Sequence, residues 1–237
     1  MNKAQNFIVL DRRAYKESDA LITCYVEGVG ILNMIARGAN KPTSKYGSLL
    51  QPLRMFEGFI NVRPGLSLFK TAKLKNRYPD IEASILALAV ASFIAKVLAN
   101  NAMDDAQMIS YDTLASYLQS IDDQHALSVG THFLMRLAQK HGVALYLEGC
   151  VICKSKQVSA LSLIKGGFLC PAHETMQPAI LHDVEFFKQL RCLSKADIHQ
   201  IHQCGSQTNR THMGLYVGLL EQIIAIPHKN WKFIQQI

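Results

Sequence analysis

Four side chains with metal-binding chemistry lie in two short pairs in the second half of the chain. Cys150 and Cys153 form a C-x-x-C pair, and Cys170 and His173 form a C-x-x-H pair after sixteen intervening residues. Thiolate and imidazole are the donors that Zn²⁺ takes in tetrahedral structural sites, and this spacing lets one turn present two donors to one ion. Because four protein ligands leave no position for water or substrate, we predict a structural zinc ion rather than a catalytic one.

Two other interpretations of the cysteines stay open. The four residues could be unrelated buried or surface side chains, or the C-x-x-C pair could be redox-active, although no βαβ pattern surrounds it. Cys24, Cys192 and Cys204 fall inside predicted strands or helices, where we expect small core residues. The chain shows no export signal, so thiols and metal ligands are expected rather than disulfides.

Positive charge is concentrated in the first third of the chain. Residues 1–80 hold 13 Lys and Arg against 6 Asp and Glu, whereas residues 81–237 hold 12 of each. This asymmetry indicates a surface that attracts a polyanion, with a merely solubilising surface as the alternative. If the polyanion is a nucleic acid such as DNA, we expect its phosphates to contact the basic residues of this region: Arg12, Arg13, Lys16, Arg37, Lys41, Lys45, Arg54, Lys70, Lys73 and Lys75.

Two features of this basic region bear on how it would hold a strand. The polar segment 37–47 is expected to be flexible enough to follow an irregular backbone. Tyr15, Tyr46 and Phe56 either stack on bases or pack within the fold.

The elements that carry these cations are predicted to be strands. Five short runs rich in β-formers lie at 7–10, 20–26, 31–36, 53–62 and 67–74, with glycine-containing turns after the second and fourth. Five short strands with an early meander favour a small closed barrel such as the OB-fold. We therefore expect an OB-fold nucleic-acid-binding domain over residues 1–79.

After Asp80 the pattern becomes helical. Apolar periodicity predicts helices at 81–100, 110–120, 125–146, 183–193, 195–204 and 208–226. The segment 148–176, which carries both ligand pairs, breaks this periodicity and is expected to hold a β-hairpin between them. The predicted fold class is therefore α+β, with an N-terminal OB-fold barrel followed by an all-α domain (80–237) that contains a zinc-finger-like insert (148–176).

Membrane and catalytic roles are not favoured. The longest apolar run, 85–95, has eleven residues, against about 20 for a membrane span. The acidic pairs Asp104-Asp105 and Asp122-Asp123 lie at predicted helix ends and are interpreted as caps, not as a Mg²⁺ cluster for a nuclease or polymerase. We expect a cytoplasmic protein that is not an enzyme.

Several segments resemble the RecO family of DNA repair proteins, in the expected order along the chain. RRAYKESDAL at 12–21 is similar to the opening strand of that family, and GVGILNMIARGA at 28–39 to its first hairpin. LQP at 50–52, FLMRLAQKHG at 133–142 and GGFLCP at 166–171 match later elements. His173 stands where zinc-bearing members usually have a fourth Cys, and the tail 227–237 lacks a basic ending expected of the family.

The resemblance implies a recombination mediator for DNA repair after DNA damage. Such a protein binds single- and double-stranded DNA, anneals complementary strands and interacts with the single-stranded DNA-binding protein (SSB). With RecR it helps to load RecA onto SSB-coated DNA, in the bacterial cytoplasm and on the nucleoid when acting. The alternative from the residues alone is a zinc-stabilised protein–protein adaptor whose basic barrel meets an acidic partner.

Overall fold

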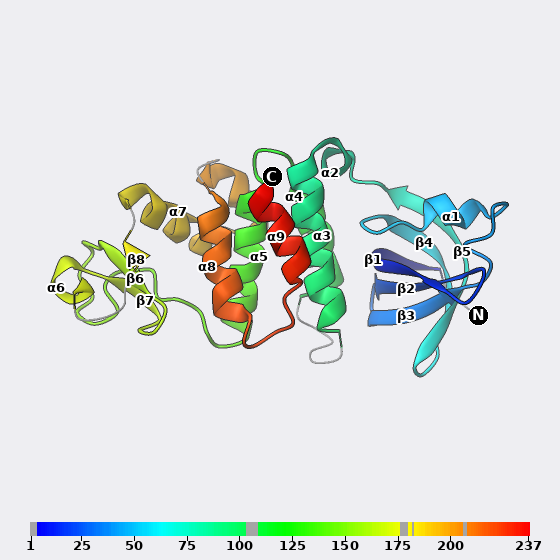
Figure 1. The fold of residues 1–237 in the computed structure, drawn as a ribbon, viewed down its shortest axis with the longest axis horizontal. Coiled ribbons are helices and arrows are strands. Elements are labelled where there is room, and N and C mark those ends of the chain that lie inside the picture. Colours follow the sequence, from blue (N-terminus) through cyan, green and yellow to red (C-terminus); the bar gives the residue numbers. More distant parts are fainter. Residues whose placement is uncertain (1–3, 103–108, 176–179, 182, 206–207) are drawn as a thin grey trace. The chain divides into compact units, whose positions relative to one another are not determined.

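The computed structural model in Figure 1 describes residues 4–102, 109–175, 180–181, 183–205 and 208–237. The chain divides into two units, one formed by Met1–Asp123 with Ala225–Ile237 and the other by Gln124–Ile224. The domain boundary after residue 79 remains a prediction. Asp104 and Asp105 lie outside the described residues.

Five strands of the first unit close into a barrel of order β1-β2-β3-β5-β4. Neighbouring strands of the barrel are antiparallel, except that β3 and β5 run parallel to each other. This is the arrangement of a five-stranded OB-type barrel. The predicted barrel is confirmed. Its strands are β1 (Gln5–Tyr15), β2 (Asp19–Val26), β3 (Gly30–Ala36), β4 (Met55–Asn61) and β5 (Leu66–Asn76).

The barrel is filled by side chains that alternate with outward-facing ones along each strand. Phe7 stacks on Phe56 with ring centroids 5.3 Å apart and meets Phe69 edge-on at 6.5 Å. Phe56 is completely buried, so the idea that it stacks on bases is wrong: its parity on β4 directs it into the core. The short helix α1 (Lys45–Leu49) follows β3 and packs Tyr46 edge-on against Phe69 at 4.9 Å.

Helices α2 (Pro79–Ala83), α3 (Ile85–Asn100), α4 (Tyr111–Ser120) and α9 (His228–Gln236) complete the first unit. The single helix predicted at 81–100 is interrupted at Ser84, whose side chain accepts a hydrogen bond from the Ala87 N–H and caps α3. Ser84 also donates to Asp123, so this acidic side chain accepts from a neighbouring element. The tail helix α9 was not predicted, and it lies beside α3 (Figure 1), with Trp231 edge-on to Phe93.

In the second unit, α5 (Ala126–Lys140) packs against α8 (Arg210–Leu220) (Figure 1). Helix α7 (Val184–Lys195) is followed by a 3₁₀ helix, η1 (Ile198–Cys204), where an α-helix from 195 was predicted. A disulfide joins Cys192 to Cys204. The expectation that both are unpaired core residues is therefore wrong, because α7 and η1 fold back and bring them together.

The insert contains a three-stranded sheet of order β7-β6-β8 and one short helix. The predicted hairpin between the two ligand pairs is confirmed, with Ala160 opposite Leu169. None of the helices in the described part of the chain has the length and apolar character needed to cross a membrane. The elements of the insert are β6 (Ala160–Ser162), β7 (Gly167–Leu169), α6 (Pro171–Glu174) and β8 (Ile180–Leu181), so its sheet extends past the predicted end at residue 176.

Candidate metal centre and nucleic-acid interface

The four residues predicted as metal ligands converge at one point of the insert. The Cys153 and Cys170 sulfur atoms are 3.6 Å apart, and Nδ1 of His173 lies 3.6 Å from the Cys150 sulfur and 3.2 Å from that of Cys170. All four ligand atoms lie within 4.8 Å of one another. Cys150 and Cys170 are buried, whereas Cys153 faces solvent.

These separations fit a tetrahedral ion. With Zn–S bonds of about 2.3 Å and Zn–N bonds of about 2.0 Å, tetrahedral angles put two sulfur atoms about 3.8 Å apart and a sulfur and a nitrogen about 3.5 Å apart. The donor set, three thiols and one imidazole, is also one that structural zinc accepts. The residues present could therefore hold a metal ion with little rearrangement.

The first ligand pair sits on a tight backbone turn. The Cys150 N–H donates to the Ser155 carbonyl at 2.8 Å, and the Lys154 N–H donates to the Cys150 carbonyl at 2.8 Å. A Cβ on Gly149 would lie 2.7 Å from the Ser155 carbonyl oxygen, too close for any other residue without a shift of the backbone. Gly149 thus permits the turn that aims both thiols at one point.

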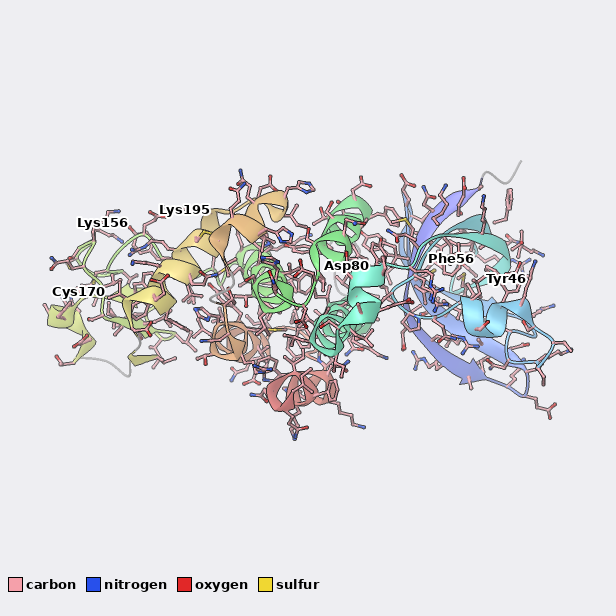
Figure 2. The ribbon with its side chains drawn as sticks, turned by 90° about the horizontal axis from the view of Figure 1, so that it is seen from above. Tyr46, Phe56, Asp80, Lys156, Cys170 and Lys195 are labelled. Carbon is pink, nitrogen blue, oxygen red and sulfur yellow. A yellow bond between two sulfur atoms is a disulfide. The ribbon has the colours of Figure 1, made fainter. Side chains whose placement is uncertain are left out.

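The second pair lies at the start of α6, which Cys170 precedes. The His173 and Glu174 N–H groups both donate to the Cys170 carbonyl, at 2.9 and 3.0 Å. The side chains of Ala160 and Leu169 pack beneath the buried cysteines. Figure 2 shows Cys170 in the same small lobe as Lys156 of the first turn.

The electrostatics of the cluster favour loss of a proton from one thiol. Burial raises the pKa of Cys150, but surrounding N–H groups outweigh it and bring the pKa from 9.0 to about 6. These N–H groups belong to Cys153, Cys170 and Ile152. Burial raises the pKa of Cys170, as do its hydrogen bonds with the other two thiols. A cation that bound here would displace the remaining thiol protons, because the thiolate is the form that ligates metal.

Helix α7 fixes the insert to the rest of its unit through residues that sequence reasoning missed. The Arg191 Nε donates to the Leu147 carbonyl at 2.7 Å, and its guanidinium lies 5.3 Å from the Phe168 ring centroid. Lys195 forms an ion pair with Glu148 at 3.1 Å. No local pattern marks these partners, because both contacts join residues more than 20 positions apart.

The structure divides the ten predicted phosphate contacts into two classes. Three are already engaged: Arg12 donates to Asn40 at 2.6 Å, Arg54 pairs with Glu82 at 3.4 Å, and Lys75 pairs with Glu57 at 3.2 Å. Arg54 also donates to the backbone carbonyls of Ser48 and Leu49. These bonds tie Arg12 and Arg54 to neighbouring segments of the first unit, and their contact with phosphate stays a prediction.

The other seven are exposed, and no ion pair involves any of them within the described ranges. Four gather where the β1–β2 turn meets the segment after β3. We call them the loop surface: Arg13, Lys16, Arg37 and Lys41.

Hydrogen bonds between the two segments hold the loop surface together. The Gly38 N–H donates to the Asp19 carboxylate at 2.8 Å, the Asn40 N–H donates to the Ser18 carbonyl at 2.8 Å, and the Asn40 side chain donates to the Asp19 carbonyl at 2.5 Å. Gly38 and Asn40 thus tie the first part of the segment 37–47 to the β1–β2 turn, and the flexibility of the segment stays a prediction. The cations are presented in a set arrangement.

The remaining three cations, Lys45, Lys70 and Lys73, lie on α1 and β5 and are called the strand surface. Lys70 is the extra residue of a β-bulge: Phe69 pairs with Ile60 and Thr71 with Phe59, which leaves Lys70 without a cross-strand partner. The Tyr46 hydroxyl bonds that of Thr71 at 2.8 Å and ties α1 to this strand. The bulge turns Lys70 and Thr71 outward together.

Helices cover part of the outer face of β1 and β2. Lys96 of α3 forms an ion pair with Asp11 at 2.8 Å, and Tyr25 donates to the Ile109 carbonyl and lies edge-on to Tyr111. These contacts leave the barrel loops and the outward side chains of β4 and β5, such as Phe59 and Thr71, exposed. Arg63, exposed in the β4–β5 loop, was missed by the sequence prediction, although the predicted turn around it is a common ligand loop of OB-folds.

Comparisons with known proteins match nearly the whole chain. The family model "Recombination protein O N terminal" matches residues 1–78, and "Recombination protein O C terminal" matches residues 78–232. A DNA repair protein RecO of Levilactobacillus brevis is 30% identical over 240 residues, covering 97% of this chain and 91% of the relative. The RecO of Exiguobacterium sibiricum is 33% identical over 180 residues, 73% of this chain and 70% of the relative. That of Syntrophobacter fumaroxidans is 25% identical over 242 residues, 97% and 95% of the two chains.

Proposed function

Since this chain belongs to the RecO family of DNA repair proteins, we propose that it is a recombination mediator. In this proposal it binds single- and double-stranded DNA through its barrel and anneals complementary strands. With RecR, it helps to load RecA onto DNA coated by SSB. In this proposal no covalent bond is made or broken, and annealing and RecA loading take place on the bacterial chromosome.

The observation that carries the proposal is the set of exposed, unpaired cations on the barrel. Seven of the ten predicted contacts are exposed and form no ion pair among the described residues. Cations that neutralise phosphates release condensed counterions, which gives affinity without sequence preference and a strong dependence on salt. Annealing needs such sequence-blind holding, because it screens the charge repulsion between two strands and leaves their bases free to pair.

The loop surface is suited to phosphates of either DNA form. Its four cations sit on backbone segments fixed by Asn40 and Asp19, so little ordering is needed on binding. Charge alone does not distinguish paired from unpaired bases. We therefore assign general affinity for DNA to this surface.

We further propose that Cys150, Cys153, Cys170 and His173 hold one Zn²⁺ with a structural role. Four protein donors would close its coordination shell. Two of the donors belong to the small core of the insert, so binding of the ion would be coupled to folding of the insert. In this assignment the metal stabilises the second unit and does not touch DNA.

A strand-annealing assay with and without SSB tests the function, together with titration of a labelled oligonucleotide across salt concentrations. We expect annealing of naked and SSB-coated strands, and an affinity that falls linearly with salt on logarithmic axes. A slope near zero, or no binding at all, would favour the adaptor function. Metal-dependent cleavage of the DNA would show an enzyme instead.

A further inference from the structure

One aromatic ring of the barrel faces solvent. Phe59 on β4 is 39% exposed, while the other phenylalanines of the barrel are buried: Phe7, Phe56 and Phe69. It alternates with the inward Gly58 and Ile60, so its strand parity directs it to the outer face. A single exposed apolar residue is common on protein surfaces, so only the residues around Phe59 can indicate a role for it.

The surroundings of Phe59 are cationic. Its cross-strand partner is Thr71, and the bulge places Lys70 next to Thr71 on the same outer side. Lys73 follows two residues further along β5, pairing with Glu57, and diagonal neighbours of this kind lie about 7–8 Å apart. Glu57 is already engaged by Lys75 at 3.2 Å. Phe59 therefore has the cationic side chains of Lys70 and Lys73 as its neighbours.

Helix α1 extends the same surface. The Tyr46 hydroxyl bonds Thr71, the residue opposite Phe59, and the Lys45 ammonium lies 5.1 Å from the Tyr46 ring centroid. Figure 2 shows Tyr46 on this helix beside the barrel. Tyr46 and Tyr15 are both partly covered, and each ring already has a lysine over it. Phe59 has no ring contact or cation–π contact among the described residues.

We propose that Phe59 stacks on an unpaired base, and that the strand surface with Phe59 binds single-stranded DNA in preference to duplex. Binding of single strands without sequence preference requires an aromatic ring and cations that neutralise the phosphates of the DNA backbone, since every base has a face on which a ring can stack. In a duplex the bases already stack on one another, so the ring gains nothing. This inference rests on the proposed DNA binding and adds a site that separates the two DNA forms.

The same face could instead dock a protein, because Val62 and Leu66 nearby are also exposed. The lysines favour an anionic occupant, and DNA is the expected one because the chain belongs to a family of DNA repair proteins. Lys45, Lys70 and Lys73 lie on this face and form no ion pair among the described residues, and a strand of phosphates complements them along its length. The protein alternative is an outcome of the test below.

The test compares Phe59→Leu with Phe59→Tyr in the full-length protein. Leucine keeps the apolar contact but removes the ring, and tyrosine keeps the ring. The probes are a fluorescein-labelled oligo(dT) and a blunt duplex of the same length. We expect Phe59→Leu to raise the Kd for oligo(dT) by about five- to one-hundred-fold, with the duplex Kd changed less than twofold and Phe59→Tyr close to the unaltered protein.

A Phe59→Trp variant adds a spectroscopic test. The chain has one other tryptophan, Trp231, which is 8% exposed. Stacking predicts saturable quenching of the new indole by oligo(dT), with little change in the unaltered protein. Because the side chain faces solvent, all three variants should melt within about 2 °C of the unaltered protein.

The outcomes separate this inference from the proposed function. If the unaltered protein binds neither probe, both fail. If it binds oligo(dT) and Phe59→Leu binds equally well, only the stacking role of Phe59 is overturned. That result would favour a protein as the occupant of this face. Equal losses for both probes, or for leucine and tyrosine alike, would also overturn it, because stacking affects unpaired bases and depends on the ring.

Discussion

The barrel and the metal-binding insert are held together in different ways. The barrel core contains 13 buried residues, among them Phe7, Phe56 and Phe69. The corresponding cluster of the insert contains four, Cys150, Ala160, Leu169 and Cys170, and two of these are candidate metal ligands. A core that small buries too little apolar surface to offset the conformational entropy of ordering the insert, so such modules need a metal or another crosslink.

Because the barrel needs no ion and the insert does, we expect metal loss to affect the stability of the insert and not the proposed DNA binding of the barrel. The loop and strand surfaces belong to the barrel, whose strands pair through a closed ladder that needs no ion. The insert depends on its four ligand atoms being brought together. Loss of metal should therefore damage one region and leave the candidate DNA-binding cations of the other in place.

The largest expected effect comes from Cys150→Ser. Removing one of four ligands forfeits part of an apparent binding free energy of about 10–16 kcal/mol in structural zinc sites. We expect the free energy of unfolding of the second unit to fall by about 4 kcal/mol or more, and the zinc content to drop below one ion per chain. Calorimetry and metal analysis measure both. DNA affinity should change less than about twofold, and its loss without a loss of stability would show that the metal has another role.

A substitution at Gly58 is expected to destabilise the barrel without affecting the metal site. A Cβ on Gly58 would lie 2.3 Å from the Thr71 carbonyl oxygen and 2.6 Å from the Ala72 Cβ. Overpacking of this kind costs typically about 1–3 kcal/mol, and we expect Gly58→Ala to reach the upper end because two of the close atoms are backbone or fixed by it. Urea unfolding of the variant gives the value, with zinc content unchanged.

Gly218→Ala is the matched control for that variant. A Cβ at this exposed position of α8 meets nothing within 4 Å, and alanine is favoured over glycine in helices by about 1 kcal/mol. The same substitution should therefore stabilise the second unit. If both variants lost stability equally, the clash at Gly58 would not be the reason.

Cys192→Ser sharpens the distinction between crosslinks and ligands. The disulfide closes a loop with a sequence separation of 12, and its loss should cost about 2–3 kcal/mol. Thermal unfolding of the variant, without reductant, measures this. Zinc content should stay at one ion per chain, because Cys192 and Cys204 lie outside the ligand cluster. A fall in zinc content would mean that α7 positions the insert through this bond.

What the sequence predicts well is local. The four ligands follow from two C-x-x pairs, and a tight turn of about four residues is enough to bring each pair together. The five strands follow from alternation over short runs, because burial of one face imposes a period of two. Each of these patterns can be recognised without knowing the neighbours in space.

What the sequence does not predict depends on distant partners. Helix α9 is short and gains its stability from Trp231 against Phe93, more than 130 positions away. Arg12 was predicted to contact phosphate, and no pattern in the sequence indicated its hydrogen bond to the Asn40 side chain. Lys70 and Thr71 both face outward only because of a register shift opposite Phe59 and Ile60. In each case, one long-range contact decides the role of the side chain.

The smallest expected effect comes from paired charge reversals, one in each region. Arg37→Glu with Lys41→Glu alters the loop surface, and Lys156→Glu with Lys165→Glu alters two exposed lysines of the insert. The first pair should weaken oligo(dT) binding by about 10- to 30-fold and lower the salt slope by about 1.4, since each single-strand phosphate contact contributes about 0.7. Fluorescence anisotropy across salt measures both quantities.

The insert pair changes the net charge of the protein by the same amount, so it controls for the long-range field. If DNA binds only at the barrel, the insert pair loses less than about threefold, because its lysines then contact no phosphate and salt screens the field of exposed charges. Equal losses from the two pairs would mean that the insert also contacts DNA, and the assignment of stability to one region and binding to the other would fail. A loss confined to Arg37 and Lys41 would instead locate the phosphate contacts where Asn40 fixes the loop to the β1–β2 turn.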